Sequence, residues 1–267
     1  MITKRRAALD GVELDSLDSR ILIQGTEPGA GREQINSARL WDGSGSRVTN
    51  EHRDSLDVVI RYSLDIKPAR FQERAAVHER ILGWAARGGW LTLSQKPGRT
   101  LRVVPAQLPA EGDPLAWTTR YAITFRAFGV PYWQDMAAVA WSATGAAEPY
   151  GRLGIPGTVK TVLDAEFVNT GSAAVDSVTL TAGESEFQLE GLGLQPGETL
   201  AIDHPDDGRL CVVRIRIKSA GGVWRSAMAC RLAESSDDLW VEPGIRELSM
   251  TADGAGNLTL RCWGRYA

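Results

Sequence analysis

Hydrophobic residues recur at helical spacing in one segment of the chain and at strand spacing almost everywhere else. Positions three or four apart share one face of a helix, and residues 69–87 carry such an apolar face. Pro68 before this segment and Gly88 after it are typical start and stop residues. The sequence therefore predicts one helix over about residues 69–87. Its apolar face includes Phe71, Ala75, His78 and Leu82.

Short runs with alternating apolar and polar residues precede and follow this helix. Alternation with period two is typical of strands that are buried on one face. Strands are expected at residues 20–24, 56–64, 90–93, 101–104 and 118–128. Gly- and Pro-rich residues 25–31 and 42–46 are expected as loops, and Lys96-Pro97-Gly98 as a hairpin turn.

Small residues, glycine and proline dominate residues 142–157, which makes this stretch the best candidate for a linker. Beyond it, every segment is typical of strand and turn, and strands at such close spacing favour an antiparallel sandwich. A last hairpin is expected around residues 253–257. The sequence thus predicts a mainly β protein with an N-terminal β-domain at 1–145, a linker at 146–157 and a β-sandwich at 158–267.

The composition is that of a folded globular protein. The 267 residues carry 30 Lys and Arg against 33 Asp and Glu, a net charge of −3, so nothing points to a nucleic-acid binder. Apolar runs are far shorter than the roughly 20 residues of a membrane helix, and no signal peptide is expected. Cys211, Cys230 and Cys262 lack paired spacing and are expected to be reduced.

The search for chemistry yields few candidates. His52, His78 and His204 lie in unrelated contexts and form no zinc motif. We expect His78, on the apolar helix face, to be a packed core or interface residue. The acidic stretch 203–208 is the most metal-like one, but it lacks the EF-hand pattern, and a solvated turn is the favoured interpretation.

Motifs for nucleophilic catalysis and for phosphate binding are missing as well. The sequon at Asn257 is taken as coincidental. Most of the nine tryptophans are expected in the core, with one or two between subunits. We therefore predict no catalytic, cofactor-binding or metal-ligating residue, no cofactor and no enzymatic activity. The tryptophans are Trp41, Trp84, Trp90, Trp117, Trp133, Trp141, Trp224, Trp240 and Trp263.

Motifs near both ends of the chain resemble a known family. Residues 9–14 and 21–25 form the N-terminal pattern, and the C-terminal one runs from residues 167–173 through 200–203 to 239–244. A strand that ends in Cys262-Trp263-Gly264-Arg265-Tyr266 closes the chain. In order and spacing, these segments resemble the distal tail proteins of bacteriophages with long non-contractile tails.

The resemblance implies a structural virion component: an N-terminal β-domain with a helix, then a galectin-like sandwich, assembled into a homohexameric ring. Such a ring is a hub at the distal end of the tail, put together in the host cytoplasm. It joins the major tail tube protein to the tail-associated tip protein, and in some cases to receptor-binding proteins. Neither nucleic acid nor membrane insertion is implied.

A ring must close through one heterologous interface that is repeated around an axis. Open strand edges can provide it, and the turn-rich residues 25–56 could form an arm that reaches a neighbour. The alternative function is a carbohydrate-binding sandwich that contributes to host adhesion. However, His204-Pro205-Asp206 is not the galectin motif H-x-N-P-R, and Trp224 stands without its usual partners. An unrecognised hydrolase is the third hypothesis.

Overall fold

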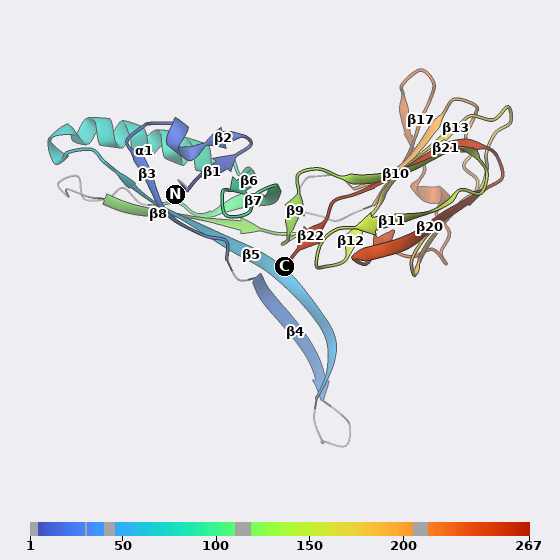
Figure 1. Cartoon of the computed structure of the whole chain (residues 1–267), viewed down its shortest axis with the longest axis horizontal. Helices are drawn as coiled ribbons and strands as arrows, with labels where there is room; N and C mark the ends of the chain where they lie inside the picture. Colours follow the sequence, from blue (N-terminus) through green and yellow to red (C-terminus); the bar gives the residue numbers. More distant parts are fainter. Residues whose placement is uncertain (1–4, 30, 40–45, 110–118, 205–212) are drawn as a thin grey trace. The chain divides into compact units, whose positions relative to one another are not determined.

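The computed structural model describes residues 5–29, 31–39, 46–109, 119–204 and 213–267. The chain divides into two compact units, with the boundary between Trp133 and Gln134. Each unit is built mainly from antiparallel strands, and the first carries the α-helix (Figure 1). The mainly β fold class predicted from the sequence is confirmed.

The first unit consists of one antiparallel sheet and a helix that covers it. The strand order is β2-β1-β6-β7-β8-β5-β3, and β4 pairs with β5. The elements are β1 (Ala7–Leu9), β2 (Val12–Glu13), η1 (Leu14–Ser16), β3 (Ile21–Glu27), β4 (Gly31–Arg39), β5 (Ser46–Leu64), η2 (Pro68–Arg70), α1 (Phe71–Ala86), β6 (Gly89–Leu93), β7 (Arg99–Gln107) and β8 (Thr119–Ala127).

Helix α1 covers one face of this sheet. Of the predicted apolar face, His78 is buried, but Phe71 is 53% exposed and Ala75 and Leu82 are only partly buried. The buried residues of the helix are Arg74, Val77, His78, Ile81, Trp84 and Ala85. His78 is 4% exposed, and its ring centroid lies 4.9 Å from that of Tyr121 on β8. The indole of Trp84 meets the ring of Phe125 edge-on at 5.9 Å, a favoured aromatic geometry. Gly88 follows the helix with a φ of 61°, which glycine adopts without strain.

The second unit is a sandwich of two sheets. One has the order β10-β21-β13-β16-β17-β18 and the other β11-β20-β14-β15, while β12 pairs with β19. The elements are β9 (Trp133–Asp135, from the boundary), β10 (Val139–Ala146), β11 (Tyr150–Ile155), β12 (Thr161–Val162), β13 (Asp164–Asn169), β14 (Val178–Ala182), β15 (Ser185–Leu189), β16 (Thr199–Asp203), β17 (Arg214–Lys218), β18 (Trp224–Ser226), η3 (Met228–Cys230), β19 (Trp240–Val241), β20 (Gly244–Ala252), β21 (Gly256–Cys262) and β22 (Arg265–Tyr266).

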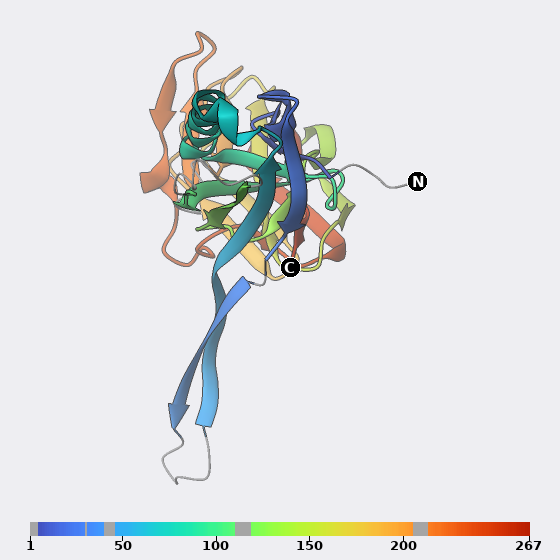
Figure 2. The same ribbon diagram turned by 90° about the vertical axis from the view of Figure 1, so that its left-hand side faces the viewer.

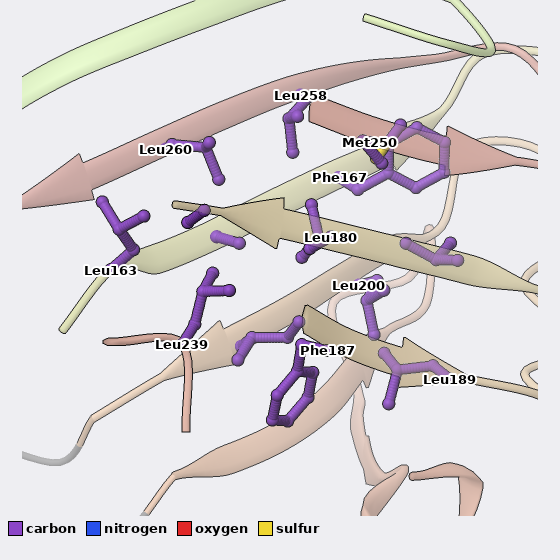
Figure 3. Close-up of a cluster of buried hydrophobic side chains, with 14 of the residues drawn as sticks. Leu163, Phe167, Leu180, Phe187, Leu189, Leu200, Leu239, Met250, Leu258 and Leu260 are labelled. Atoms are coloured by element: carbon purple, nitrogen blue, oxygen red, sulfur yellow. The ribbon is translucent and has the colours of Figure 1, made fainter. Parts of the chain in front are cut away.

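One apolar core lies between the two sheets of this unit (Figure 3). Phe167 on β13 and Leu200 on β16 come from the six-stranded sheet, whereas Phe187 on β15 and Met250 on β20 come from the four-stranded sheet. All four side chains are at most 1% exposed. Because the buried side chains come from both sheets, the packing is that of a β-sandwich.

Three expectations about the connections differ from the structure. The predicted linker 146–157 contains strand β11, and the unit boundary lies twelve residues before position 145. Residues 25–27, expected in a loop, continue β3 after a register shift between Ile23 and Gly25. Residues 253–257 form no hairpin, because β20 and β21 belong to different sheets and this turn carries the chain across the sandwich.

Candidate functional site

A two-stranded ribbon extends from the sheet of the first unit. Strand β5 pairs with β8 over residues 56–64 and with β3 over residues 59–64, but over residues 46–55 it pairs with β4 alone. The pairing with β4 runs from Gly31 opposite Leu56 to Arg39 opposite Ser46. Figures 1 and 2 show that β5 passes without a break from the sheet into this ribbon. Residues 31–39 and 46–55 are called the ribbon below.

The ribbon has few apolar residues that could stabilise it. Ile35 and Val48 are its only large aliphatic residues, and most others are charged or polar. An isolated two-stranded ribbon is marginally stable in water, and a third strand or a packed surface is needed to hold it. Within the described residues, the ribbon has no third strand to support it. It coincides with the arm expected from residues 25–56.

Ion pairs fix the strands from which the ribbon starts. Nη2 of Arg126 on β8 donates to Oδ2 of Asp57 on β5 at 2.7 Å, and Arg61 on β5 pairs with Glu27 on β3. The hydrogen bond to Asp57 raises the pKa of Arg126 above its ordinary value. These cross-strand pairs link β3, β5 and β8 at the base of the ribbon.

A second group of charges lies in the first unit, where Asp18 faces the surface of helix α1. Its carboxylate accepts hydrogen bonds from Arg20 at 2.9 Å and from Arg80 of the helix at 3.1 Å, and Arg20 also reaches Glu73 at 2.7 Å. The hydrogen bond from Arg20 holds the pKa of Asp18 well below its usual range. This network ties the segment before β3 to the helix and is structural in character.

In the second unit, His204 joins two carboxylates. Its Nδ1 lies 2.7 Å from Oδ1 of Asp164, and its Nε2 lies 2.7 Å from Oδ1 of Asp238. Burial disfavours the charged ring, but the hydrogen bonds with Asp164 and Asp238 outweigh it and raise the pKa of His204 to about 9. The ring is therefore protonated at neutral pH and donates from both nitrogens, which leaves no lone pair for general-base catalysis.

Of residues 203–208, expected as a solvated turn, the structure describes only Asp203, which ends β16, and His204. The side chain of His204 is only 10% exposed, and Asp203 at the end of β16 accepts from Arg214 at 2.6 Å and from Arg216 at 2.7 Å. Residues 205–208 lie outside the described part of the chain. No sequence signal links Asp164 or Asp238 to His204, since the three positions are far apart.

An exposed indole lies on the outer face of the six-stranded sheet. Trp224 on the edge strand β18 is 43% exposed. The guanidinium carbon of Arg216 lies 4.4 Å from its ring centroid, and Nζ of Lys218 lies 5.7 Å from it. Both distances are within the range of cation–π attraction. The set is a flat aromatic surface bordered by positive charge.

The other candidate residues are less informative. His52 belongs to the ribbon, and its side chain lies outside the described part, as do Trp41, Trp117 and Cys211. Trp84 and Trp133 are buried, so the expectation that most tryptophans lie in the core is wrong for the described residues. The partly buried ones are Trp90, Trp141, Trp240 and Trp263. Cys230 and Cys262 are free thiols, and burial raises the pKa of Cys262 to about 11.

The chemistry available in the described residues is limited. In residues 5–29, 31–39, 46–109, 119–204 and 213–267, no cluster of three or more His, Cys, Asp or Glu side chains has an arrangement that could hold a metal ion. The same part of the chain contains no helix with the length and apolar character needed to cross a bilayer.

Comparison with known proteins reveals a fold shared with phage tail components. No family model matches the sequence, and no curated protein matches it. The crystal structure of Dit (gp 19.1) of SPP1, a paradigm of the hub adsorption apparatus in phages that infect Gram-positive bacteria, is similar with a TM-score of 0.71 and 14% sequence identity. The similarity covers 97% of this chain and 98% of Dit.

A chain of the phage P2 baseplate in its activated conformation with Ca is similar with a TM-score of 0.51 and 8% identity, over 98% of both chains. Both structures belong to phage tail-tip assemblies, the class to which the sequence motifs point. Over almost its whole length, this chain has the fold of a phage hub protein.

Proposed function

We propose that this protein is a structural component of a phage virion: a hub at the distal end of the tail. In this role it joins the major tail tube protein to the tail-associated tip protein and to receptor-binding proteins. The observation that carries the proposal is the match to SPP1 Dit across 97% of the chain, which includes both units. A similarity restricted to the sandwich would have much less weight, because sandwiches serve many functions.

The hub is a homohexameric ring in this proposal, with a galectin-like C-terminal sandwich and no enzymatic activity. The ribbon provides the ring contact. It presents two strand edges over residues 31–39 and 46–55 that no other strand of the described chain occupies. Such edges pair readily with another chain. A contact between the ribbon of one copy and a different surface of the next is heterologous, as ring closure requires.

The test is the mass of the full chain in solution by light scattering. The wild type is expected at six times the chain mass of 29.0 kDa. In a ribbon-less variant, residues 33–54 are replaced by an Asn-Gly turn, so that Arg32 and Ser55, which pair in the structure, close a two-residue hairpin. This variant is expected at the mass of one chain, with an unchanged far-UV circular dichroism per folded residue. A monomeric wild type, or a ring that survives without the ribbon, contradicts the proposed assembly.

A second function, carbohydrate binding by the sandwich, is favoured by Trp224. An exposed indole offers a flat surface for the apolar face of a sugar ring, and Arg216 and Lys218 border it. The full chain on a glycan array tests this, with Trp224→Ala as the site variant and Tyr150→Ala, which removes an exposed aromatic residue elsewhere, as the matched control. Binding that Trp224→Ala abolishes and Tyr150→Ala retains supports adhesion by the hub. Absence of binding removes this second function and leaves the hub proposal intact.

A further inference from the structure

Strand β11 is a regular edge strand of the four-stranded sheet. Its six residues, Tyr150–Ile155, pair one by one with β20 and without a register shift. In the described part of the chain, no strand pairs with the other edge of β11. The strand lies between Pro149 and Pro156, which define its two ends.

The hydrogen bonds of β20 show which backbone groups of β11 face this free edge. The N–H of Met250 donates to the carbonyl of Pro149, on the β11 side, whereas the carbonyl of Glu247 accepts from Gly183, on the opposite side. Residues that alternate along a strand direct their backbone groups to opposite edges. The backbone groups of odd-numbered β20 residues therefore face away from β11. The β11 residues opposite them likewise direct their backbone groups away from β20. By this alternation, the N–H and C=O groups of Tyr150, Arg152 and Gly154 are directed to the free edge.

The other edges of the sandwich are blocked by devices that proteins use against strand addition. The edge of β15 is covered, since Gln188 exchanges hydrogen bonds with Ser235 and Leu232, and Glu186 with Ser236. Strand β18 has only three residues, and β10 loses its regular register between Ala143 and Ala146. Strand β11 has none of these devices.

Side chains beside the free edge indicate what kind of strand fits there. Ile245 on β20 lies opposite Gly154 and is 76% exposed, because the glycine has no side chain to cover it. A large apolar side chain on an added strand, placed beside Gly154, would cover this isoleucine. Two residues along on the same face, the guanidinium of Arg152 is fixed at 2.8 Å from Glu247. An acidic residue opposite Arg152 complements its charge from the free side.

We propose that the free edge of β11 binds an extended segment of another protein by strand addition. The segment carries an acidic residue and a large apolar residue two positions apart, which meet Arg152 and Gly154. A second copy of this chain fits less well. In the antiparallel pairing of two β11 strands that places Tyr150 beside Gly154, Arg152 of one copy lies directly opposite Arg152 of the other, and like charges in that position repel. The inference holds for the sandwich itself and does not depend on the ring.

A peptide with the sequence of β20, residues 244–252, is the probe. In β20, Ile245 lies opposite Gly154 and Glu247 opposite Arg152, so the peptide already has the required pattern. With a fluorescein label, it is expected to show saturable binding to the full chain by fluorescence anisotropy, whereas a scrambled peptide does not bind. Hydrogen exchange followed by mass spectrometry is expected to slow in the segment that contains residues 150–155.

Two substitutions at one position test the edge itself. Gly154→Pro removes an N–H that faces the free edge and adds a ring there, while the pairing with β20 does not use this N–H. It is expected to weaken peptide binding about tenfold or more. Gly154→Ala is the matched control, because its Cβ meets no atom within 4 Å, and its affinity is expected to equal that of the wild type.

If the proline variant fails to fold, as judged by circular dichroism, Gly154→Lys replaces it, since a lysine at an edge also opposes strand addition. Three results overturn the proposal: no saturable binding to the wild type, equal affinity for the edge-blocking variant, or protection from exchange only outside residues 150–155. None of these results bears on the light-scattering test of the ring.

Discussion

Nε2 of His204 lies 2.7 Å from Oδ1 of Asp238, and both side chains are almost buried. Since the second ring nitrogen is hydrogen-bonded to Asp164, His204 connects the end of β16 to the start of β13 and to the segment before β19. Removal of one partner from such a buried ionic group leaves charge without compensation, which is costly.

The His204 triad makes the second unit less stable as the pH becomes alkaline. The pKa of His204 is raised from 6.5 to about 9. A group with a raised pKa stabilises the fold fully below its unfolded pKa, and this contribution decreases as the pH rises through the folded value. The shift corresponds to about 3 kcal/mol. Urea unfolding should therefore show a free energy that falls between pH 6.5 and pH 9.5.

The variant His204→Gln isolates this effect. It is expected to be less stable than the wild type at pH 6 and to show a flatter profile between pH 6.5 and pH 9.5, because the titrating group is gone. Parallel profiles for the two proteins would show that His204 does not carry the charge assigned to it.

Position 256, the first residue of β21, requires glycine because strand β13 approaches it closely. A Cβ at Gly256 would collide with the ring of Phe167 and would lie 2.6 Å from the carbonyl oxygen of Val168, which belongs to the backbone and cannot turn away. Gly256→Ala is expected to cost about 1–3 kcal/mol of unfolding free energy by chemical denaturation, as overpacking does. Gly154→Ala, at a strand glycine with open space, should leave stability within about 0.5 kcal/mol of the wild type. Equal stability of the two variants would contradict this account of Gly256.

The sequence predicts the helix and most strands because their signals are local. Pro68, Gly88 and the apolar face of residues 69–87 need no distant partner, and the alternation of Tyr121, Ile123 and Phe125 matches their burial on β8. The wrong prediction of a linker at residues 146–157 arises because a glycine there serves close packing. At Gly151, a Cβ would collide with the indole of Trp141, so this glycine allows close packing rather than flexibility.

The candidate sites depend on long-range partners that no spacing reveals. The ribbon is anticipated as an arm, yet its pairing follows from the register of β4 with β5 and not from a motif. The triad draws on positions 164, 204 and 238, and the free edge of β11 can be recognised only once its neighbours are known. Periodicity shows which face of a strand is buried, but it does not show which edge is left open.

The division of the chain into two compact units predicts two unfolding transitions that respond to different substitutions. Ile81 on α1 belongs to the first unit, and Phe187 on β15 belongs to the second; both are completely buried. Truncation of such side chains costs about 2–5 kcal/mol, which lowers the midpoint of the affected unit by on the order of 10 °C. In scanning calorimetry, Ile81→Ala should shift one transition and Phe187→Ala the other. A shift of both transitions by either variant would show that the units unfold as one.

Helix α1 is held in place by a buried arginine in addition to its apolar face. Arg74 is 4% exposed, and its Nη2 donates at 2.6 Å to the carbonyl of Ile66, which lies just before η2. Methionine has a similar length and no donor, so Arg74→Met retains the packing and leaves this carbonyl without its partner. The expected cost is about 1–3 kcal/mol, measured by chemical unfolding. Arg87→Met is the control, because it makes the same chemical change at an exposed position beyond the helix; its unfolding free energy should equal that of the wild type. Comparable losses of unfolding free energy in both variants would mean that the buried hydrogen bond does not fix the helix.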